Sequence, residues 1–315
     1  MLIYEKLKQR PEDFLCATGL TVAEFERMLP TFSQVYHRKY GGDQTVEGQP
    51  RQRKAGGGVK GKLPAMADKL LFILVYEKTY PLQTMHGLAF GLSQERANEW
   101  IHRLLPVLQE TLAAMGMRPE REAQALAHSD LMQDLPADLL VDGTERRRQR
   151  PQDNEQQVDH YSGKNKAHTD KNLVLVNVAS GQVFYLSDTE AGKKHDKRLA
   201  DEQPIAYPPG ATLGKDTGFQ GYEPPGVVTY QPKKKPRQGQ LAVEDKFLNK
   251  IFSAVRIQVE HVIGGVKRCR IVKDTFRNTN ERFADLVMEV ACGLHNFRMA
   301  CRHPLPTLNL LDLCT

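Results

Sequence analysis

A long amphipathic segment near the C-terminus constrains the fold of this chain most strongly. From residue 248 to residue 266 the apolar side chains recur at the spacing of one helix face. The members of this apolar arc are Leu248, Ile251, Phe252, Val255, Val259, Val262, Ile263 and Val266. Because an apolar face of this length has to be covered, the pattern predicts a long helix that packs by one side on the rest of the protein.

One carboxylate, Glu260, lies outside this apolar arc. At about 100° per residue, Arg256, Gly264 and Lys267 fall within about 40° of it on the same predicted helix. One interpretation is a solvated surface with a Glu–Arg pair four residues apart, worth a few tenths of a kcal/mol. The other is a site that combines a carboxylate with cations. Taken alone, the pattern favours the solvated surface.

Length and composition exclude several classes of protein. A chain of 315 residues has room for two or three domains. Its longest apolar run, residues 70–76, is far too short to span a membrane, and the N-terminus lacks the apolar stretch of a signal peptide. The five cysteines are scattered without a CxxC pair, which argues against a disulfide framework or a zinc cluster. We therefore expect no membrane partner and a reducing cytoplasm.

The positive charge is moderate in total but strongly clustered. The formal net charge is +6, from 44 Lys and Arg against 38 Asp and Glu. Local basic clusters cover residues 51–62, 146–150, 164–171, 233–237 and 267–273. Any single cluster could be ordinary solubilising charge, but five of them favour a polyanionic partner such as DNA.

The first 63 residues predict short helices followed by a linker. Thr21 with Glu24 has the spacing of a capping box and predicts the start of a helix within residues 1–40. Residues 41–63 are rich in glycine and cations without hydrophobic periodicity, which is typical of a flexible segment. This segment is interpreted equally well as an arm that follows phosphates and as a simple tether.

Residues 65–110 predict three helices in a compact unit. The first covers residues 67–80, and the second begins with Pro81 in its first turn and ends at Gly91. Ser93 caps the third. Trp100, Leu104, Val107 and Leu108 are expected to face the core, whereas Gln94, Arg96, Asn98 and Arg103 are expected to face outward.

A short helix, a glycine-containing turn and a helix rich in Arg, Asn and Gln together are typical of a helix-turn-helix. Those side chains read base edges in the major groove. A small three-helix bundle that binds nothing has a similar pattern, but the neighbouring basic segment favours DNA binding.

The pattern changes to an α/β domain with a mixed sheet after residue 136. Residues 137–141 and 211–215 read as short strands, and residues 171–178 and 182–187 read as an antiparallel hairpin. A short helix opens at His195, and the extended segment VVTYQP precedes the long helix.

Two carboxylates, Asp142 and Asp216, are expected at the ends of predicted strands, each with a glycine within two residues. Strand ends are common site positions in α/β folds, although an Asx turn or a helix cap explains either residue taken singly. If the fold brings them together with Glu260, their repulsion requires cations. A site with oxygen ligands and no His or Cys selects Mg²⁺ or Mn²⁺, and two such ions about 4 Å apart support phosphodiester cleavage.

These features together give the chain a family resemblance. It resembles the DDE-type transposases of bacterial insertion sequences, which have an RNase H-like catalytic domain after a helix-turn-helix. The resembling segments are DKLLFILVYEKTYP, FGLSQERANEWIHRLLPVL, VDGTERRRQRP, YSGKNKAHTDKNLVLVNV, GKKHDKRL, KDTGFQGY, QPKKKPRQG and VRIQVEHVIGGVKRCRIVKDTFRN. The resemblance implies that the catalytic, metal-binding Asp, Asp and Glu are Asp142 in VDGTE, Asp216 in KDTGFQGY and Glu260 in VEHVIG.

The resemblance also implies an activity, a domain order and partners. The expected reaction is metal-dependent hydrolysis at the ends of a transposon, followed by attack of the freed 3′-hydroxyl on target DNA, with two Mg²⁺ or Mn²⁺ ions per active site. We expect a helical segment and linker at 1–63, a helix-turn-helix at 64–117, the catalytic domain at 136–303 and a tail at 304–315. The expected partners are the double-stranded transposon ends and target, bound by a homo-oligomer associated with the nucleoid.

The charge pattern adds expected DNA contacts to these carboxylates. Arg256, Lys267 and Arg268 are expected to hold phosphates. The residues expected to line the DNA path are Arg146, Arg147, Arg148, Lys164, Lys166, Lys233, Lys234 and Lys235. His195 with Asp196 is interpreted either as an acid–base pair or as a helix cap, and the cap is favoured.

Two other functions remain open at this level. A transposase-derived protein with a silent catalytic domain would bind DNA without cutting it, although all three acidic residues are present here. A repair or recombination nuclease of the same fold would cut branched or damaged DNA.

Overall fold

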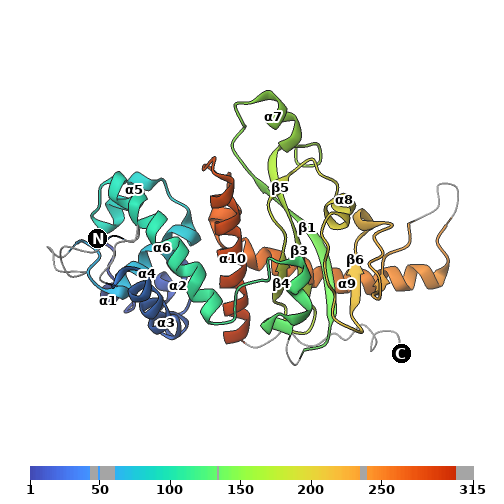
Figure 1. The fold of residues 1–315 in the computed structure, drawn as a ribbon, viewed down its shortest axis with the longest axis horizontal. Helices are drawn as coiled ribbons and strands as arrows, with labels where there is room; N and C mark the ends of the chain where they lie inside the picture. Colours follow the sequence, from blue (N-terminus) through green and yellow to red (C-terminus); the bar gives the residue numbers. More distant parts are fainter. Residues whose placement is uncertain (43–48, 50–60, 133–134, 235–239, 303–315) are drawn as a thin grey trace.

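The computed structural model describes residues 1–42, 49, 61–132, 135–234 and 240–302. An N-terminal helical half is followed by a half built on a sheet, and helix α10 (Glu281–Cys301) stands between the two (Figure 1). This confirms the predicted fold class, a mixed α/β domain of the RNase H-like kind after an all-α unit. The predicted tail and most of the predicted linker lie outside the described residues. Within the described part, no helix is both long and apolar enough to cross a membrane.

The helices of the N-terminal half share one core. Their bounds are α1 (Tyr4–Leu7), α2 (Pro11–Thr18), α3 (Val22–Tyr40), α4 (Met66–Thr79), α5 (Gln83–Phe90) and α6 (Gln94–Ala114). The predicted capping box is present, because the Thr21 hydroxyl accepts from the Glu24 N–H at 3.2 Å and Glu24 Oε2 accepts from the Thr21 N–H at 2.8 Å. Helix α4 is buried from Asp68 to Glu77 because α2, α3 and α6 all pack against it.

The turn between α5 and α6 forms as its residues predict. Gly91 ends α5 with a φ of 70°, a conformation that favours glycine, and the Ser93 hydroxyl accepts from the Arg96 N–H at the start of α6. The buried side chains of α6 include Leu104, Val107 and Leu108, as predicted.

Two details of this unit differ from the prediction. Pro81 precedes α5 and is not part of its first turn, because Tyr80 takes a left-handed conformation at the end of α4 and Leu82 is extended and serves as the N-cap. Trp100 is only partly buried at the edge of the core, where the charged ends of Lys69 and Arg103 lie over its ring.

The second half contains one mixed sheet. Its strands are β1 (Asp138–Arg147), β2 (Tyr161–Ser162), β3 (Ala167–Asn177), β4 (Val183–Leu186), β5 (Glu190–Ala191), β6 (Thr212–Lys215) and β7 (Val228–Tyr230). The strand order is β2-β3-β1-β6-β7, with β4 and β5 also paired to β3. β1 is antiparallel to β3 and parallel to β6, and β3 with β4 forms the predicted antiparallel hairpin.

Strand β1 is longer than predicted, and the expectation that it ends before Asp142 is wrong. It continues to Arg147 because β3 pairs with it from Leu139 to Arg147. Opposite charges face each other across the two strands, Glu145 with Lys171 and Arg146 with Asp170. These cross-strand pairs keep a polar sequence in a strand that its apolar pattern alone would have ended.

The sheet lies between two apolar cores, because successive side chains along each strand point to opposite faces. Leu139, Val141, Leu173 and Leu175 belong to a core on one face, with α8 (Asp196–Asp201) nearby. Their neighbours Leu140, Val174 and Val176 belong to the other core, which continues through α9 (Val243–Val266) and α10 into the helical half. The two halves are therefore joined by a continuous apolar interior.

Helix α9 follows the predicted apolar arc only over its second part. Val259, Val262 and Val266 are buried against the sheet and α10, whereas Leu248 is exposed. Figure 1 shows the first turns of α9 extending beyond the edge of the sheet. The remaining short elements are α7 (Asn154–His160), η1 (Ala123–His128), η2 (Asp130–Met132), η3 (Thr217–Phe219) and η4 (Arg270–Val272).

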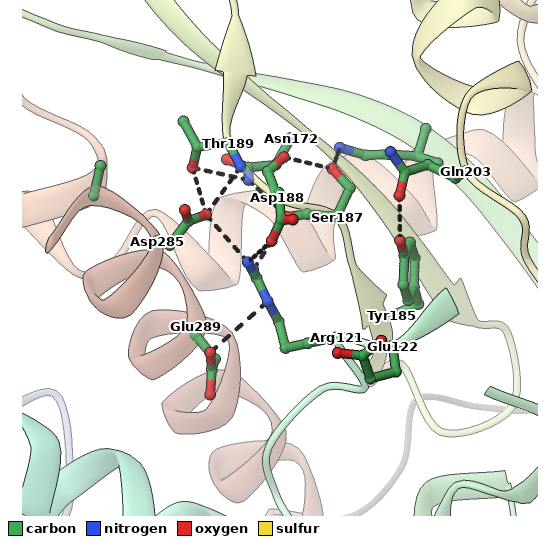
Figure 2. A network of polar contacts seen from close by, with 12 residues as sticks. Arg121, Glu122, Asn172, Tyr185, Ser187, Asp188, Thr189, Gln203, Asp285 and Glu289 are labelled. Atoms are coloured by element: carbon green, nitrogen blue, oxygen red, sulfur yellow. Dashed lines mark hydrogen bonds and ion pairs between the residues drawn. The ribbon is translucent and has the colours of Figure 1, made fainter. Parts of the chain in front are cut away.

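A polar network fastens α10 to the sheet half (Figure 2). Arg121 donates to Asp188 on the segment after β4 and to Asp285 on α10, at 2.5 and 3.2 Å. Asp285 in turn accepts from the hydroxyl and the N–H of Thr189, at 2.8 and 2.9 Å. Since Arg121, Asp285 and Thr189 are partly buried while Asp188 is exposed, the inner part of the network holds α10 in place on the sheet half.

Candidate active site

The register of two neighbouring strands brings Asp142 and Asp216 together. β1 and β6 are parallel, and Val141 pairs with Lys215, so the next residue along each strand is an aspartate. Residues at matched positions point to the same face, and neighbouring strands lie about 4.8 Å apart. Asp142 is therefore in the middle of β1 and Asp216 directly after β6, on the face of the sheet that α9 covers.

The environment of Asp142 disfavours its ionised form. Burial raises the pKa of Asp142 to about 6, and the charges of Asp216 and Asp196 act in the same direction. A hydrogen bond of 2.8 Å from the Gly143 N–H and the charge of Arg256 act against the rise. A buried carboxyl group beside other carboxylates is the arrangement that a bound cation stabilises.

Asp216 is fixed by the turn that follows β6. Its Oδ1 accepts from the Gly218 N–H at 2.7 Å, which caps the short helix η3. The Asx-turn interpretation is therefore correct for the backbone, and it does not exclude a functional role, because Oδ1 alone accepts that bond. Gln231 also donates to the Asp216 carbonyl at 2.7 Å and ties the following segment to this turn.

A third aspartate, Asp196, lies against the same two turns. A Cβ added to Gly143 would come within 2.5 Å of Asp196 Oδ1, and one added to Gly218 within 3.0 Å of Asp196 Oδ2. Lys171 Nζ lies 3.1 Å from Asp196 Oδ1 and 3.5 Å from Glu145 Oε1. The sequence suggested Asp196 as part of an acid–base pair with His195 or as part of a helix cap, and it placed Lys171 in a basic cluster. It did not relate Asp196, Lys171 and Glu145 to one another, because nothing local connects these positions.

Glu260 is not brought into contact with the aspartates. Its Oε1 accepts from Arg256 Nη2 at 2.9 Å, and its side chain is 55% exposed. The hydrogen bond to Glu260, with smaller contributions from Asp216 and Asp142, raises the pKa of Arg256 although partial burial opposes this. Arg256 is thus the cation that lies between Glu260 on α9 and the two aspartates, Asp142 and Asp216.

Glu260 and Asp216 also line different cavities. Asp216 lines a small cavity with Arg256 and Val259, whereas Glu260 lines a larger one with Arg268 and Arg298. Among the described residues, no three His, Cys, Asp or Glu side chains are placed to hold one metal ion. The predicted convergence of the three carboxylates is therefore present for the two aspartates only.

The donors at Asp142 and Asp216 are nevertheless chemically suited to a hard divalent ion. Both offer carboxylate oxygens, with no His or Cys between them, and the described residues give Asp142 Oδ1 one backbone hydrogen bond and Oδ2 none. Burial raises the pKa of Asp142, and none of the described Lys, Arg or His side chains forms an ion pair with it. The two aspartates therefore fit a hard divalent ion, and the Arg256 side chain separates them from Glu260.

Arg146 was expected to line a DNA path, and the structure contradicts this. It is 3% exposed and donates to the Ala284 carbonyl at 3.1 Å and to Asn172 and Thr189 at 2.8 Å each. Because it points to the same face as Asp142 and Thr144, it lies under α10. Its guanidinium therefore joins β1 to the network of Figure 2.

The other expected DNA contacts differ in their accessibility. Arg148 is partly buried and pairs with Asp170 at 2.9 Å, and Lys267 is partly buried and donates to the Glu145 carbonyl at 3.0 Å. Lys235 lies outside the described residues. The exposed residues are Arg147, Lys164, Lys166, Lys233, Lys234, Arg256 and Arg268.

The predicted base-reading residues lie along α6. Gln94, Arg96 and Arg103 are exposed, and Arg96 pairs with Glu99 at 2.7 Å on the same helix. Asn98 is partly buried and accepts from Gln83 Nε2 at 2.9 Å, so its side chain also joins α6 to α5. Three of the four predicted base-reading side chains are thus exposed, and the fourth, Asn98, is hydrogen-bonded to Gln83 within the protein.

Known proteins match both halves of the chain. The family described as "DDE superfamily endonuclease" matches residues 141–296, and "Helix-turn-helix of DDE superfamily endonuclease" matches residues 61–114. A relative from Microchaete diplosiphon, described as "Probable transposase for insertion sequence element IS702", is 25% identical over 286 residues, which are 91% of this chain and 98% of the relative. No solved structure gives a significant match.

The two matched families occupy the helical unit α4–α6 and the sheet half, in the order that their descriptions imply. Residues 141–296 belong to the DDE superfamily of endonucleases, and residues 61–114 carry the helix-turn-helix of that superfamily. The segment matched to the endonuclease family contains Asp142, Asp216 and Glu260.

Proposed function

We propose that this protein is a transposase that cuts the ends of a mobile DNA element and joins them to target DNA. The observation that carries the proposal is the pairing of Asp142 with Asp216 on adjacent parallel strands, in a domain of the DDE endonuclease superfamily. The relative described as a probable transposase extends over nearly the whole of both chains, which supports the same function.

In this proposal Asp142, Asp216 and Glu260 hold two divalent ions, Mg²⁺ or Mn²⁺. Bound ions of this kind supply an activated water or hydroxyl and stabilise the leaving oxygen of a phosphodiester. The strand-borne aspartates are fixed by the sheet register and by the N–H groups of Gly143 and Gly218. Glu260 joins them when Arg256 exchanges its carboxylate partner for a DNA phosphate.

Cations near the site have a separate role in the proposal. Arg256 is half exposed and lies within electrostatic reach of both aspartates, so it is suited to a phosphate of the bound strand. Burial lowers the pKa of Lys267 while the charge of Asp142 opposes this, and its bond to the Glu145 carbonyl holds it next to β1. Exposed Arg147, Lys164 and Lys166 extend the positive surface beyond the end of β1.

The test is a strand-cleavage assay with Mg²⁺ on DNA that carries the terminal inverted repeats of the proposed mobile element. Asp216→Asn is expected to bind this DNA but not to cut it. Asp201→Asn is a matched control, because Asp201 is an exposed aspartate at the far end of α8 that pairs with Lys197. Equal cleavage by the wild type and Asp216→Asn would refute the catalytic assignment.

A second candidate function is DNA binding without catalysis. The observation that favours it is the ion pair of Glu260 with Arg256, which leaves the third carboxylate outside the aspartate pair. Tight binding of the repeats by the wild type, with no cleavage in Mg²⁺ or Mn²⁺, would support this candidate. Cleavage of branched DNA without a preference for the repeats would instead indicate a repair or recombination nuclease.

A further inference from the structure

A cavity with a volume of about 510 Å³ lies at the C-terminal end of α9 and is distinct from the one that Asp216 lines. The end of α9 lies beside α10 here (Figure 1). A volume of this size is typical of ligand-binding cavities. The wall of this cavity includes Gly264, Gly265, Arg268, His295, Arg298 and Arg302.

Arg298 is a buried cation of this wall without a carboxylate partner. It is 4% exposed, and its described hydrogen bonds run to the Gly265 carbonyl at 2.8 Å and to the Cys269 thiol. Burial raises the pKa of this thiol to about 11, so the thiol is uncharged. No described Asp or Glu side chain forms an ion pair with Arg298. A buried guanidinium group normally has an anion beside it, so this arginine points to a partner from outside the protein.

The end of α9 accounts for part of this positive charge. The Gly265 carbonyl belongs to the last turn of α9, and such a helix end carries about half a negative charge. That is less than the charge of one guanidinium group. Arg302 is neutralised by Glu24, which accepts from it at 2.5 and 2.7 Å. Arg268 is exposed and has no ion pair among the described residues, so the wall keeps an excess of positive charge.

His295 shows the effect of this excess. Burial and the charges of Arg298 and Arg268 lower the pKa of His295 to about 4. Its Nε2 donates to the Gly181 carbonyl at 2.9 Å, whereas Nδ1, which lies against Gly265, is buried without a described partner. The carboxylate in the wall, Glu260, is 55% exposed and pairs with Arg256. The described residues therefore leave the positive charge of the cavity uncompensated.

We propose that this cavity is an anion site that takes a phosphate group, with Arg298 as its buried cation and Arg268 as an exposed one. Arginine presents several N–H donors in one plane, which matches the oxygens of a phosphate. A backbone phosphate of DNA and a free phosphate ion share this chemistry. The site goes beyond the proposed function, because it is separate from the aspartate pair and binds its ligand whether or not that pair is catalytic.

Gly264 offers a test that removes no contact. It lines the cavity, and a Cβ at this position would meet nothing within 4 Å. Gly264→Glu adds a negative charge to the wall, and Gly264→Gln is its neutral match. Calorimetry would measure the binding of inorganic phosphate to the full-length protein, with chloride at equal ionic strength as the reference. Gly264→Glu is expected to bind phosphate about tenfold or more weakly than Gly264→Gln, because like charges repel.

Two arginine variants test the cations themselves in the same titration. Arg298→Gln is expected to lose detectable phosphate binding, with a melting curve as the check of folding. Arg268→Gln is expected to weaken it about threefold or more. Arg270→Gln is the matched control, since Arg270 is exposed, pairs with Asp274 and is not part of the wall.

If Arg298→Gln does not fold, the other variants decide. No phosphate binding by the wild type, or wild-type phosphate affinity in both Gly264→Glu and Arg268→Gln, would overturn the inference.

A gel-shift titration with a short DNA duplex separates the two sources of the phosphate group. Weaker duplex binding by Gly264→Glu than by Gly264→Gln would indicate a backbone phosphate. Equal duplex binding by the two variants, together with weaker binding of inorganic phosphate by Gly264→Glu, would indicate a free phosphate. Asp216→Asn is expected to bind inorganic phosphate as the wild type does, so failure of this inference leaves the ion site of the proposed function untouched.

Discussion

Asp142 on β1 and Asp170 on β3 are both largely buried aspartates of one sheet, yet their environments act in opposite directions. Asp170 accepts from Arg148 at 2.9 Å and lies 3.1 Å from His160 Nδ1. Burial alone would raise the pKa of Asp170, but His160, Arg148 and Arg146 together lower it. Asp142 forms no ion pair with a described cationic side chain, and burial raises its pKa to about 6.

The difference shows which of the two carboxylates has its charge neutralised by neighbouring side chains of the protein. The ion pair of Asp170 is satisfied inside the protein, so this aspartate supports the structure. Asp142 lies beside two further aspartates, and its charge is left for a cation from outside. The comparison predicts that removing Asp142 abolishes activity and that removing Asp170 destabilises the fold.

The largest expected effect is on cleavage by Asp142→Asn. Loss of an ion ligand removes several kcal/mol of transition-state stabilisation, so the rate is expected to fall about 10³-fold or more. The amide also removes carboxylate repulsion, so the melting temperature without ions is expected to be unchanged or higher. A cleavage time course and a melting curve on the same preparation measure both. A variant that cuts normally would remove the contrast between the two aspartates.

Glu260→Gln is expected to reduce the cleavage rate about 10²-fold or more, while the protein still binds the repeats. The pair with Arg256 is exposed, so its loss is expected to change the free energy of unfolding by less than about 0.5 kcal/mol. Cleavage and gel-shift assays, with chemical denaturation of the free protein, test these points. Wild-type cleavage would mean that the glutamate stays with Arg256 throughout the reaction.

Asp170→Asn is expected to reduce the free energy of unfolding by about 3 kcal/mol at neutral pH. It leaves the partly buried Arg148 and the buried Arg146 without their carboxylate, and breaking one side of a buried ion pair costs about this much. Urea denaturation measures the change, with Asp188→Asn as an exposed aspartate control. Near-normal cleavage by the folded variant at low temperature is the second expected result.

The smallest expected effect is the pH dependence of the free energy of unfolding. It also shows the sign of the contribution that Asp170 makes to stability. Because the folded protein lowers the pKa of Asp170, its stabilisation is present above the unfolded value of about 3.8 and is lost as the pH falls through the folded value. The stability difference between the wild type and Asp170→Asn should therefore shrink on acidification below about pH 4. A difference that stays constant down to pH 2.5 would exclude this role of the ion pair.

Local patterns predicted much of the fold. The capping box at Thr21, the turn at Gly91 and the hairpin of β3 and β4 all form, because each depends on residues that lie close together in the chain. The end of β1 was predicted wrongly, since pairing with a long partner strand keeps polar residues in a strand. The exposed start of α9 was also not predicted, because periodicity shows which face is apolar and does not show how far the sheet extends.

The amino-acid sequence determined the residue types of the site and the position of Asp142 and Asp216 on neighbouring elements of an α/β fold. Tertiary structure alone decided that Arg146 is buried, that Asp196 packs against Gly143 and Gly218 and that Glu260 is held by Arg256. The physical reason is that side-chain charges interact over a few ångströms in space. Residues far apart along the chain come within that distance only after strand register and helix packing are set.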